Sequence, residues 1–322
     1  MSIFITGGCG LIGISLARAY LEKGFDVVIF DVAPEDQLPQ DLRDKVHYVK
    51  GDITNWVEVI NAVKDYEVSD IFHLAGMLSA PSEANPWQSY RVNVGGTFHV
   101  MEAARLFGIN KVLFSSSMGV YGATEDQVIT DATIQEPTII YGVTKVFDEL
   151  LGRYYHRRFG VDFRGVRFPQ LVGPGVKAGG FGQYNPGMIE AAAFGKPYEV
   201  WVPEDTILPL LYIKDAIQSL VSLYEADSSV LKSRIYNLGQ IIPSPTAKEL
   251  ADIVKTHIPD ANITFNPDPK AVEVLKTVPK KIDGSNAERE WGWVITYSAE
   301  EMVKDFLEEI DKHKDLYNEK GS

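Results

Sequence analysis

Tyr141, Lys145 and Ser117 have the types and the spacing that the oxidation of an alcohol would use. Tyr141 and Lys145 stand one helical turn apart in "YGVTK", and Ser117 is the last serine of the run in "FSSSMGVYG". A phenol has an ordinary pKa of about 10 and is a poor base at neutral pH. An ammonium one turn away and a positively charged nicotinamide ring would lower that pKa by about three units, or roughly 4 kcal/mol. We predict Tyr141 as general base and Lys145 as its electrostatic activator, although any helix brings residues i and i+4 together.

The residues that would hold a cofactor begin almost at the first residue, in "MSIFITGGCGLIG". Gly7, Gly10 and Gly13 follow a predicted strand and open a predicted helix, which is the setting of a dinucleotide-binding turn. The first glycine allows the sharp turn, the second lets a phosphate approach the backbone, and the third lets the helix pack on the strand. Leu11 and Ile12 lie between them, where a helix N-terminus offers free N–H groups to a pyrophosphate.

Asp31 supports the same interpretation, because it ends the second predicted strand, 18 residues beyond Gly13. A carboxylate at this place accepts hydrogen bonds from an adenosine ribose and repels a 2′-phosphate. No arginine follows in "DVAPEDQ" to hold such a phosphate. The sequence therefore predicts NAD rather than NADP as the cofactor.

Composition and charge exclude several other classes of protein. The 322-residue chain is 45% hydrophobic and carries a formal net charge of −13, with no basic stripe for a nucleic acid to bind. Cys9 is the only cysteine, and the six histidines lack metal-ligand spacing, so we expect no disulfide and no metal. The longest apolar runs fall well short of a bilayer span, and we expect a cytoplasmic protein with no membrane partner.

Strand and helix patterns alternate through the first half of the chain. This alternation, with strands apolar at every position, predicts an α/β fold with a doubly wound parallel sheet (a Rossmann fold). The expected strands are "SIFIT", "DVVIF", "VHYV", "DIFHLA", "KVLFSSS" and "FRGVRF", and the expected helices lie at 10–23, 55–65, 86–107 and 141–158.

From residue 169 the sequence changes to a stretch rich in glycine and proline, as a loop over a site would be. We expect further helices near 186–195, 213–226, 246–257 and 298–313, and short strands near 198–202, 209–212 and 233–239. We therefore divide the chain into an NAD-binding domain, residues 1–168 with 210–240 returning to it, and a smaller substrate-binding lid, residues 169–209 and 241–322.

The GxxGxxG spacing and the motifs that follow it resemble the extended short-chain dehydrogenase/reductase family over essentially the whole chain. The resemblance implies a catalytic role for Tyr141, Lys145 and Ser117, with Ser117 orienting the reacting oxygen and Lys145 also holding the nicotinamide ribose. It further implies cofactor contacts from residues in "GDIT", "HLAG", "RVNVGGT", "FSSS" and "RFPQLVGPG", namely Asp52, Ile53, Leu74, Ala75, Gly76, Asn93, Ser115, Phe168, Gln170 and Leu171.

Within that family, four longer stretches look like the L-threonine 3-dehydrogenase branch, which implies NAD-dependent oxidation of the β-hydroxyl of a small hydroxy acid or hydroxy amino acid. They are "HLAGMLSAPSEANP", residues 139–169, "YEVWVPEDTILPLLYIKDA" and "DGSNAEREWGW". The branch carries paired threonines after Gly179-Gly180, a tryptophan at 278 and an arginine at 280, whereas this chain has Phe181-Gly182, Val278 and Lys280. The expected substrate contacts are Ser79, Ser117, Met118, Gly180, Phe181, Gln183 and Tyr184.

Two other functions stay open at this point. A nucleotide-sugar epimerase or dehydratase would keep NAD bound and recycle it, but Met118 and Gly119 stand where a dehydratase usually carries an Asp-Glu pair. A non-catalytic dinucleotide sensor would commonly lose the tyrosine or the lysine, and this chain keeps both. The helices at 86–107 and 141–158 resemble those that form a four-helix dimer interface in the family, so we expect a homodimer.

Overall fold

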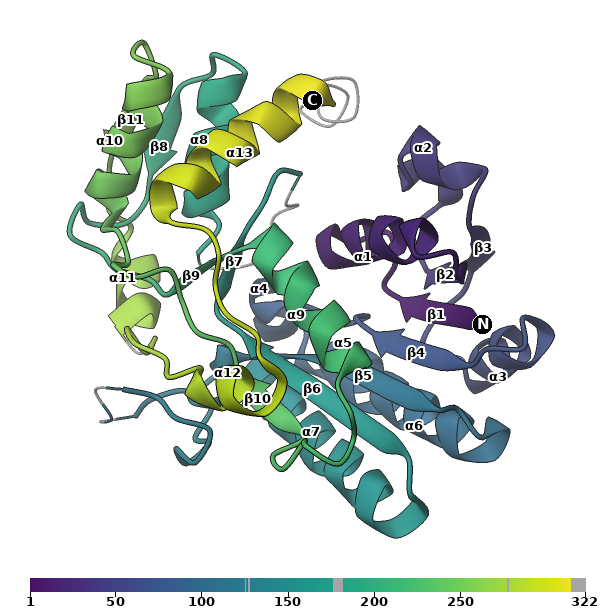
Figure 1. Ribbon diagram of the computed structural model, residues 1–322. Helices are drawn as coiled ribbons and strands as arrows, with labels where there is room; N and C mark the ends of the chain where they lie inside the picture. Colours follow the sequence, from purple (N-terminus) through teal and green to yellow (C-terminus); the bar gives the residue numbers. More distant parts are fainter. Residues whose placement is uncertain (125, 127, 176–181, 277, 314–322) are drawn as a thin grey trace.

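A central sheet of seven parallel strands organises the molecule (Figure 1). The computed structural model describes residues 1–124, 126, 128–175, 182–276 and 278–313. The strand order is β10-β6-β5-β4-β1-β2-β3. Its strands are β1 (Ser2–Thr6), β2 (Asp26–Asp31), β3 (His47–Lys50), β4 (Asp70–His73), β5 (Lys111–Ser117), β6 (Asp162–Phe168) and β10 (Ile235–Asn237). The order reverses beside β1, and ligands of such sheets bind outside the carboxyl ends of the strands at that point.

Helices cover both faces of the sheet because its strands are apolar on both sides. Ile3 and Ile5 of β1 pack with α1 (Leu11–Glu22) and α9 (Ile213–Glu225) in one core cluster. Phe4, between them, points into the other cluster, with α3 (Trp56–Asp65), α6 (Gly96–Phe107) and α7 (Ile140–Phe159). Successive side chains of a strand point to opposite faces, so each strand contributes to both cores.

Most of the chain after β6 adds a second group of elements beyond the carboxyl edge of the sheet, of which α8 (Tyr184–Ala193), α10 (Ala247–His257) and α13 (Ala299–Lys312) lie at the upper left of Figure 1. Its parts are two small parallel sheets, β7 (Gln170–Val172) with β9 (Leu210–Tyr212) and β8 (Tyr198–Val200) with β11 (Ile263–Phe265). Its described helices are α8, α10, α11 (Pro269–Lys276) and α13, whereas α12 (Ser285–Trp291) packs on β10 at the edge of the central sheet. Helices α8, α10 and α13 pack on one another.

The doubly wound parallel sheet predicted from the sequence is confirmed, and the predicted strands of the first half match β1 to β6 closely. The single helix expected at 86–107 is instead α5 (Pro86–Ser89), a π-helical turn η2 (Tyr90–Gly95) and α6. Sequence patterns missed β7, β11, α11, α12 and three short elements between the main ones: η1 (Glu35–Gln37), α2 (Gln40–Arg43) and η3 (Met118–Val120). Helix α4 (Ser79–Ala84) was also missed, because Pro81 suggests a loop although the first helical turn tolerates proline.

No helix within the described ranges is both long and apolar enough to cross a membrane. Among the same residues, no group of three or more histidine, cysteine, aspartate or glutamate side chains is arranged to hold a metal ion.

Candidate functional site

A cavity of about 1390 Å³ lies along the carboxyl ends of the central strands. Most of the residues predicted to bind the cofactor line it, although they come from segments far apart in the sequence. They are Gly7, Gly10, Leu11, Ile12, Gly13, Asp31, Asp52, Ile53, Leu74, Ala75, Gly76, Ser115, Tyr141, Lys145, Phe168, Gln170 and Leu171. The fold therefore brings these predicted residues to one place.

The glycine turn between β1 and α1 has the shape that a dinucleotide-binding turn requires. Gly7 has a φ of +70°, and a Cβ there would lie 2.8 Å from backbone atoms of Ala75. A Cβ at Gly13 would lie 2.6 Å from the Cα of Gly8, so only glycine lets α1 start this close to the turn. Gly10 is the N-cap of α1, and no side chain caps the helix there. The first N–H groups of α1 are thus left for a ligand, and this cradle fits a pyrophosphate.

Two carboxylates flank the turn. The Asp31 carboxylate accepts hydrogen bonds from the backbone N–H groups of Cys9 (2.9 Å) and Ala33 (3.0 Å), which fixes it beside the glycine turn. The Asp52 carboxylate accepts one from the N–H of Thr54 at 2.8 Å. Both carboxylates line the cavity, so acceptors for the adenosine part of a dinucleotide face it from β2 and from the loop after β3.

A buried chain of side chains shapes the segment Leu74–Gly76. The Thr6 hydroxyl accepts the N–H groups of Leu74 and Ala75 at 3.2 Å and lies 2.7 Å from Nδ1 of His73. Nε2 of His73 then contacts the Thr97 hydroxyl at 2.9 Å. Burial, together with the Lys145 charge, lowers the pKa of His73 to about 3, so this imidazole stays neutral.

Asn93 lies behind the cavity wall and does not line the cavity. Its side-chain oxygen accepts the N–H of Met77 at 2.7 Å, and its amide nitrogen donates to the Thr144 hydroxyl at 2.9 Å. Asn93 therefore ties the segment after β4 to the helix that carries Tyr141. This contact connects η2 with α7 and gives Asn93 a supporting position.

Ser117, Tyr141 and Lys145 meet where β5 ends and α7 begins. The Ser117 hydroxyl accepts the N–H of Gly119 at 3.1 Å and forms a hydrogen bond with the Tyr141 phenol. Burial raises the pKa of Tyr141 to about 12, and the Ser117 hydrogen bond opposes that rise. Nζ of Lys145 donates to the backbone oxygen of Ser115 at 2.8 Å and lies 5.8 Å from the centre of the Tyr141 ring. Burial lowers the pKa of Lys145, and two carboxylates on the same helix oppose that fall.

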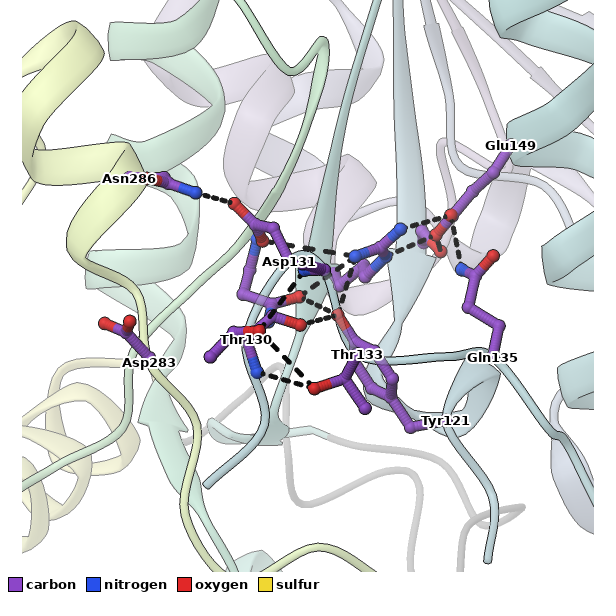
Figure 2. A network of polar contacts seen from close by, with 12 residues as sticks. Tyr121, Thr130, Asp131, Thr133, Gln135, Glu149, Asp283 and Asn286 are labelled. Carbon is purple, nitrogen blue, oxygen red and sulfur yellow. Dashed lines mark hydrogen bonds and ion pairs between the residues drawn. The ribbon is translucent and has the colours of Figure 1, made fainter. Parts of the chain in front are cut away.

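A second polar cluster, centred on Glu149, connects α7 with β5 and β6 (Figure 2). The buried Glu149 carboxylate accepts hydrogen bonds from the Ser116 hydroxyl (2.5 Å), from the Gln135 amide (2.7 Å), and from Nε and Nη2 of Arg167 (2.8 and 2.7 Å). Arg167 also donates to the Tyr121 hydroxyl at 2.6 Å.

The cluster continues into the C-terminal third of the chain (Figure 2). Asp131 accepts hydrogen bonds from the Asn237 N–H at 2.6 Å and from the Asn286 amide at 2.7 Å. It also lies 4.0 Å from Nη1 of Arg167. Sequence reasoning missed this cluster because its members lie in six separate segments and form no motif.

The predicted substrate contacts divide into three groups. Ser79, Ser117, Met118 and Gln183 line the cavity. Tyr184 does not line it, because its ring is buried at the start of α8 with its edge toward Trp201. Gly180 and Phe181 lie outside the described residues. The cavity wall also includes residues that the sequence did not single out: Met77, Leu78, Thr138, Ile139, Leu275, Val278 and Pro279.

Comparisons with known proteins agree with this geometry. Residues 3–239 match the NAD dependent epimerase/dehydratase family. A mitochondrial L-threonine 3-dehydrogenase of Bos taurus is 32% identical over 310 residues, which is 95% of this chain and 81% of the relative. An uncharacterized epimerase/dehydratase of Staphylococcus aureus (strain USA300) is 32% identical over 323 residues, 98% of each chain.

Solved structures give the same result. The holo form of a GalE-like L-threonine dehydrogenase from Cupriavidus necator superimposes with a TM-score of 0.89 at 31% identity, covering 96% of this chain and 100% of that one. The apo form of a monomeric L-threonine 3-dehydrogenase from a metagenome gives 0.88 at 28% identity, covering 96% and 99%. The predicted resemblance is therefore confirmed, and the chain belongs to the NAD dependent epimerase/dehydratase family.

Proposed function

We propose that this chain oxidises the β-hydroxyl group of a small hydroxy acid or hydroxy amino acid, as an L-threonine 3-dehydrogenase does, with NAD as the hydride acceptor. The observation that carries the proposal is the meeting of Ser117, Tyr141 and Lys145 in the same cavity as the glycine turn. The relatives and structural neighbours named L-threonine 3-dehydrogenase support the choice of substrate class.

In this proposal the Tyr141 phenol removes the proton of the substrate hydroxyl, and the Ser117 hydroxyl holds the reacting oxygen. Bound NAD would supply the hydride acceptor and a positive charge. Burial keeps the pKa of Tyr141 near 12, so the chain alone favours the protonated phenol. Tyr141 therefore needs nearby positive charge to act as a base. The protein supplies one such charge with Lys145, whose ammonium is held in place by the Ser115 backbone oxygen.

NAD is preferred over NADP because of the Asp31 carboxylate. Its two oxygens are fixed by backbone N–H groups and line the cavity beside the glycine turn. A 2′-phosphate placed there would meet a like charge, whereas a ribose diol would donate hydrogen bonds to it. The residues present thus fit the unphosphorylated cofactor.

The division of the chain supports a lid over the substrate. We propose that residues 169–209 and 241–322 close the substrate end of the cavity, since Gln183, Leu275 and Val278 line it from that side. The proposed substrate contacts in the cavity wall are Ser79, Met118 and Gln183. Gly180 and Phe181 are also proposed, from their place in the sequence alone. The wall contributed by Leu78, Ile139 and Val278 suits a short aliphatic carbon chain better than a sugar ring.

The outer face of α7 supports a homodimer. Val143, Phe147, Leu150 and Tyr154 are 41% to 58% exposed and lie along one stripe of the helix, beside the exposed Phe98 of α6. An apolar stripe on two adjacent helices matches a symmetric four-helix contact with a second copy. One structural neighbour is named as monomeric, so the oligomeric state stays a prediction, as does the cytoplasmic location.

The proposal is tested by following NADH at 340 nm with L-threonine and with a panel of small β-hydroxy acids. Release of NADH in proportion to one substrate is the expected result. If NAD stays bound without net reduction while a nucleotide sugar is converted, the chain is an epimerase or dehydratase. If NAD binds and no substrate in either panel reacts, the sensor interpretation holds.

A further inference from the structure

Asp148 is a buried carboxylate that the proposed reaction does not use. It lies three residues after Lys145 on α7, and its exposed fraction is 0%. Neither of its oxygens accepts a hydrogen bond of normal length and angle among the described residues, although the Thr97 hydroxyl approaches the carboxylate and lowers its pKa. Buried polar groups in folded proteins are nearly always paired, so an unpaired carboxylate beside a proposed catalytic pair calls for a functional explanation.

The groups that face Asp148 are few. Lys145 and Glu149 act on it from the same helix, and the Thr97 hydroxyl faces it from α6. The Thr97 hydroxyl is itself 2.6 Å from the Asn93 backbone oxygen and 2.9 Å from Nε2 of His73. His73 stays neutral, as described above. Within the described part of the chain, Lys145 is therefore the one cation among the groups that act on Asp148.

Glu149 does not replace Asp148 as a partner of Lys145. Its carboxylate forms a two-point ion pair with Arg167, which balances its charge. The lysine, in turn, directs Nζ toward the Ser115 backbone oxygen and lies 4.5 Å from the centre of the Phe114 ring. Lys145 and Asp148 thus act on each other through charge without a direct ion pair, in a buried setting where such interactions are screened little.

We propose that Asp148 is a positioning residue that places a titratable negative charge behind Tyr141 and Lys145 and so fixes the pH range in which this pair transfers a proton. The inference rests on the proposed role of Tyr141 as base. Asp148 acts through charge alone and touches neither substrate nor cofactor.

The direction of the effect follows from the charges. A negative charge near Tyr141 disfavours the phenolate, and Asp148 raises the pKa of Tyr141. The same charge favours the ammonium form of Lys145. Burial raises the pKa of Asp148 itself to about 8, and Lys145 opposes that rise. Removing the charge should therefore move the ionisation of both Tyr141 and Lys145 to lower pH.

The test is the variant Asp148→Asn, which keeps the shape of the side chain and removes its charge. Tyrosines labelled with ¹³C at Cζ report the ionisation of Tyr141 in the NAD complex, with the signal assigned by loss in Tyr141→Phe. We expect the Tyr141 midpoint to fall by about one pH unit in Asp148→Asn. The pH profile of kcat/KM should move in the same direction. A Tyr141 midpoint within about 0.2 units of the wild-type value would overturn the proposal.

Asp70→Asn is the matched control, because Asp70 is also a buried aspartate with one unpaired oxygen. It lies at the amino end of β4, whereas Tyr141 lies near the carboxyl ends of the strands. It should leave the Tyr141 midpoint unchanged. If Asp148→Asn does not fold, the carboxyl ¹³C signal of Asp148 in the wild-type protein decides. A midpoint above about 6 supports the proposal, and a midpoint at or below that value overturns it.

The tyrosine signal needs no turnover, so the two proposals fail separately. A shifted Tyr141 in a chain that reduces no NAD would contradict the dehydrogenase function alone. NADH release with an unshifted Tyr141 would contradict the role of Asp148 alone.

Discussion

Asp148 and Glu149 are neighbours on one helix, and both are buried, yet their surroundings are opposite. Glu149 accepts four hydrogen bonds and is paired with Arg167 (Figure 2). Asp148 accepts none of normal length and angle from the described residues and faces Lys145. The Glu149 side of α7 is tied to β5, β6 and the C-terminal third, whereas the Asp148 side lies behind the proposed reacting groups.

This difference indicates which cluster serves stability and which serves chemistry. A buried charge with all its partners in place holds its neighbours in one arrangement, and removing one partner leaves a costly unpaired charge. A buried charge without partners destabilises the fold and is retained where its effect on nearby pKa values is useful. Substitutions on the two sides of α7, and then on its outer face, should separate these roles, from the largest expected effect to the smallest.

Tyr141→Phe should have the largest effect of all on catalytic activity. Loss of the general base is expected to lower kcat/KM by about 10³-fold, while NAD binding changes little because most of the predicted cofactor contacts lie elsewhere in the cavity. Steady-state kinetics and dinucleotide titration measure the two quantities. Tyr154→Phe, at an exposed position of the same helix, is the control and should keep full activity. A loss below tenfold in Tyr141→Phe would contradict the assignment.

Glu149→Gln should have the largest effect on stability. The change leaves the buried Arg167 guanidinium without its ion pair, and the free energy of unfolding should fall by about 3 kcal/mol. Denaturant unfolding measures it. Glu102→Gln removes the carboxylate from a partly exposed pair with Arg105 and should cost less than about 0.5 kcal/mol. Equal losses in the two variants would show that the Glu149 cluster is not the stronger support.

Asp148→Asn should raise the free energy of unfolding above neutral pH, whereas Glu149→Gln lowers it. The folded-state pKa of Asp148 is raised to about 8, above the ordinary aspartate value of about 4, so the folded state binds this proton more tightly. The protonated carboxyl therefore contributes stability at low pH, and that contribution is lost as the pH rises through about 8. The asparagine variant does not ionise, and its free energy of unfolding at pH 8 to 9 should exceed the wild-type value by about 1 kcal/mol.

Thermal unfolding of wild type and Asp148→Asn across pH measures this difference. The two curves should approach each other below about pH 4, where the aspartate is protonated in both folded and unfolded chains. A variant that is less stable than wild type at pH 9 would mean that Asp148 has partners that stabilise it, and the comparison with Glu149 would fail.

Phe147→Glu addresses the outer face of α7 and should have the smallest effect on chemistry. A carboxylate placed in an apolar contact between two copies loses its hydration without a partner, so the dimer should separate. Light scattering should then give 35.8 kDa instead of about twice that value. Phe147→Leu keeps the stripe apolar and should remain dimeric. A wild-type mass of one chain would refute the dimer directly.

The sequence predicted those parts of the site whose residues lie close together in the chain at a recognisable spacing. The spacing of Gly7, Gly10 and Gly13 after a strand identifies the turn, because the glycines are required by contacts within a few residues and with Ala75. Tyr141 and Lys145 are one turn apart on a helix whose pattern is clear. The sheet follows in the same way, since each buried strand is a continuous apolar run.

The parts that sequence could not predict depend on distant residues. Nothing near Glu149 indicates that Arg167, on β6, would pair with it, or that Asp148 would find no partner. Tyr184 was expected at the substrate because it stands just after the place where the related branch carries substrate-contacting threonines, but α8 begins at that residue and its ring packs in the core near Trp201. Asn93 was expected at the cofactor, and the structure places it behind the cavity wall, where its side chain accepts a hydrogen bond from Met77.

The account depends most on hydride transfer to NAD from the carbon that bears the substrate hydroxyl. Its most direct measurement uses L-threonine, or the small β-hydroxy acid that the substrate panel selects, carrying deuterium at that carbon. The account predicts that reduced nicotinamide is released and contains one deuterium per turnover, and that Tyr141→Phe releases about 10³-fold less of it with the same label. Failure to release any reduced nicotinamide, or its release without the label, would contradict the account.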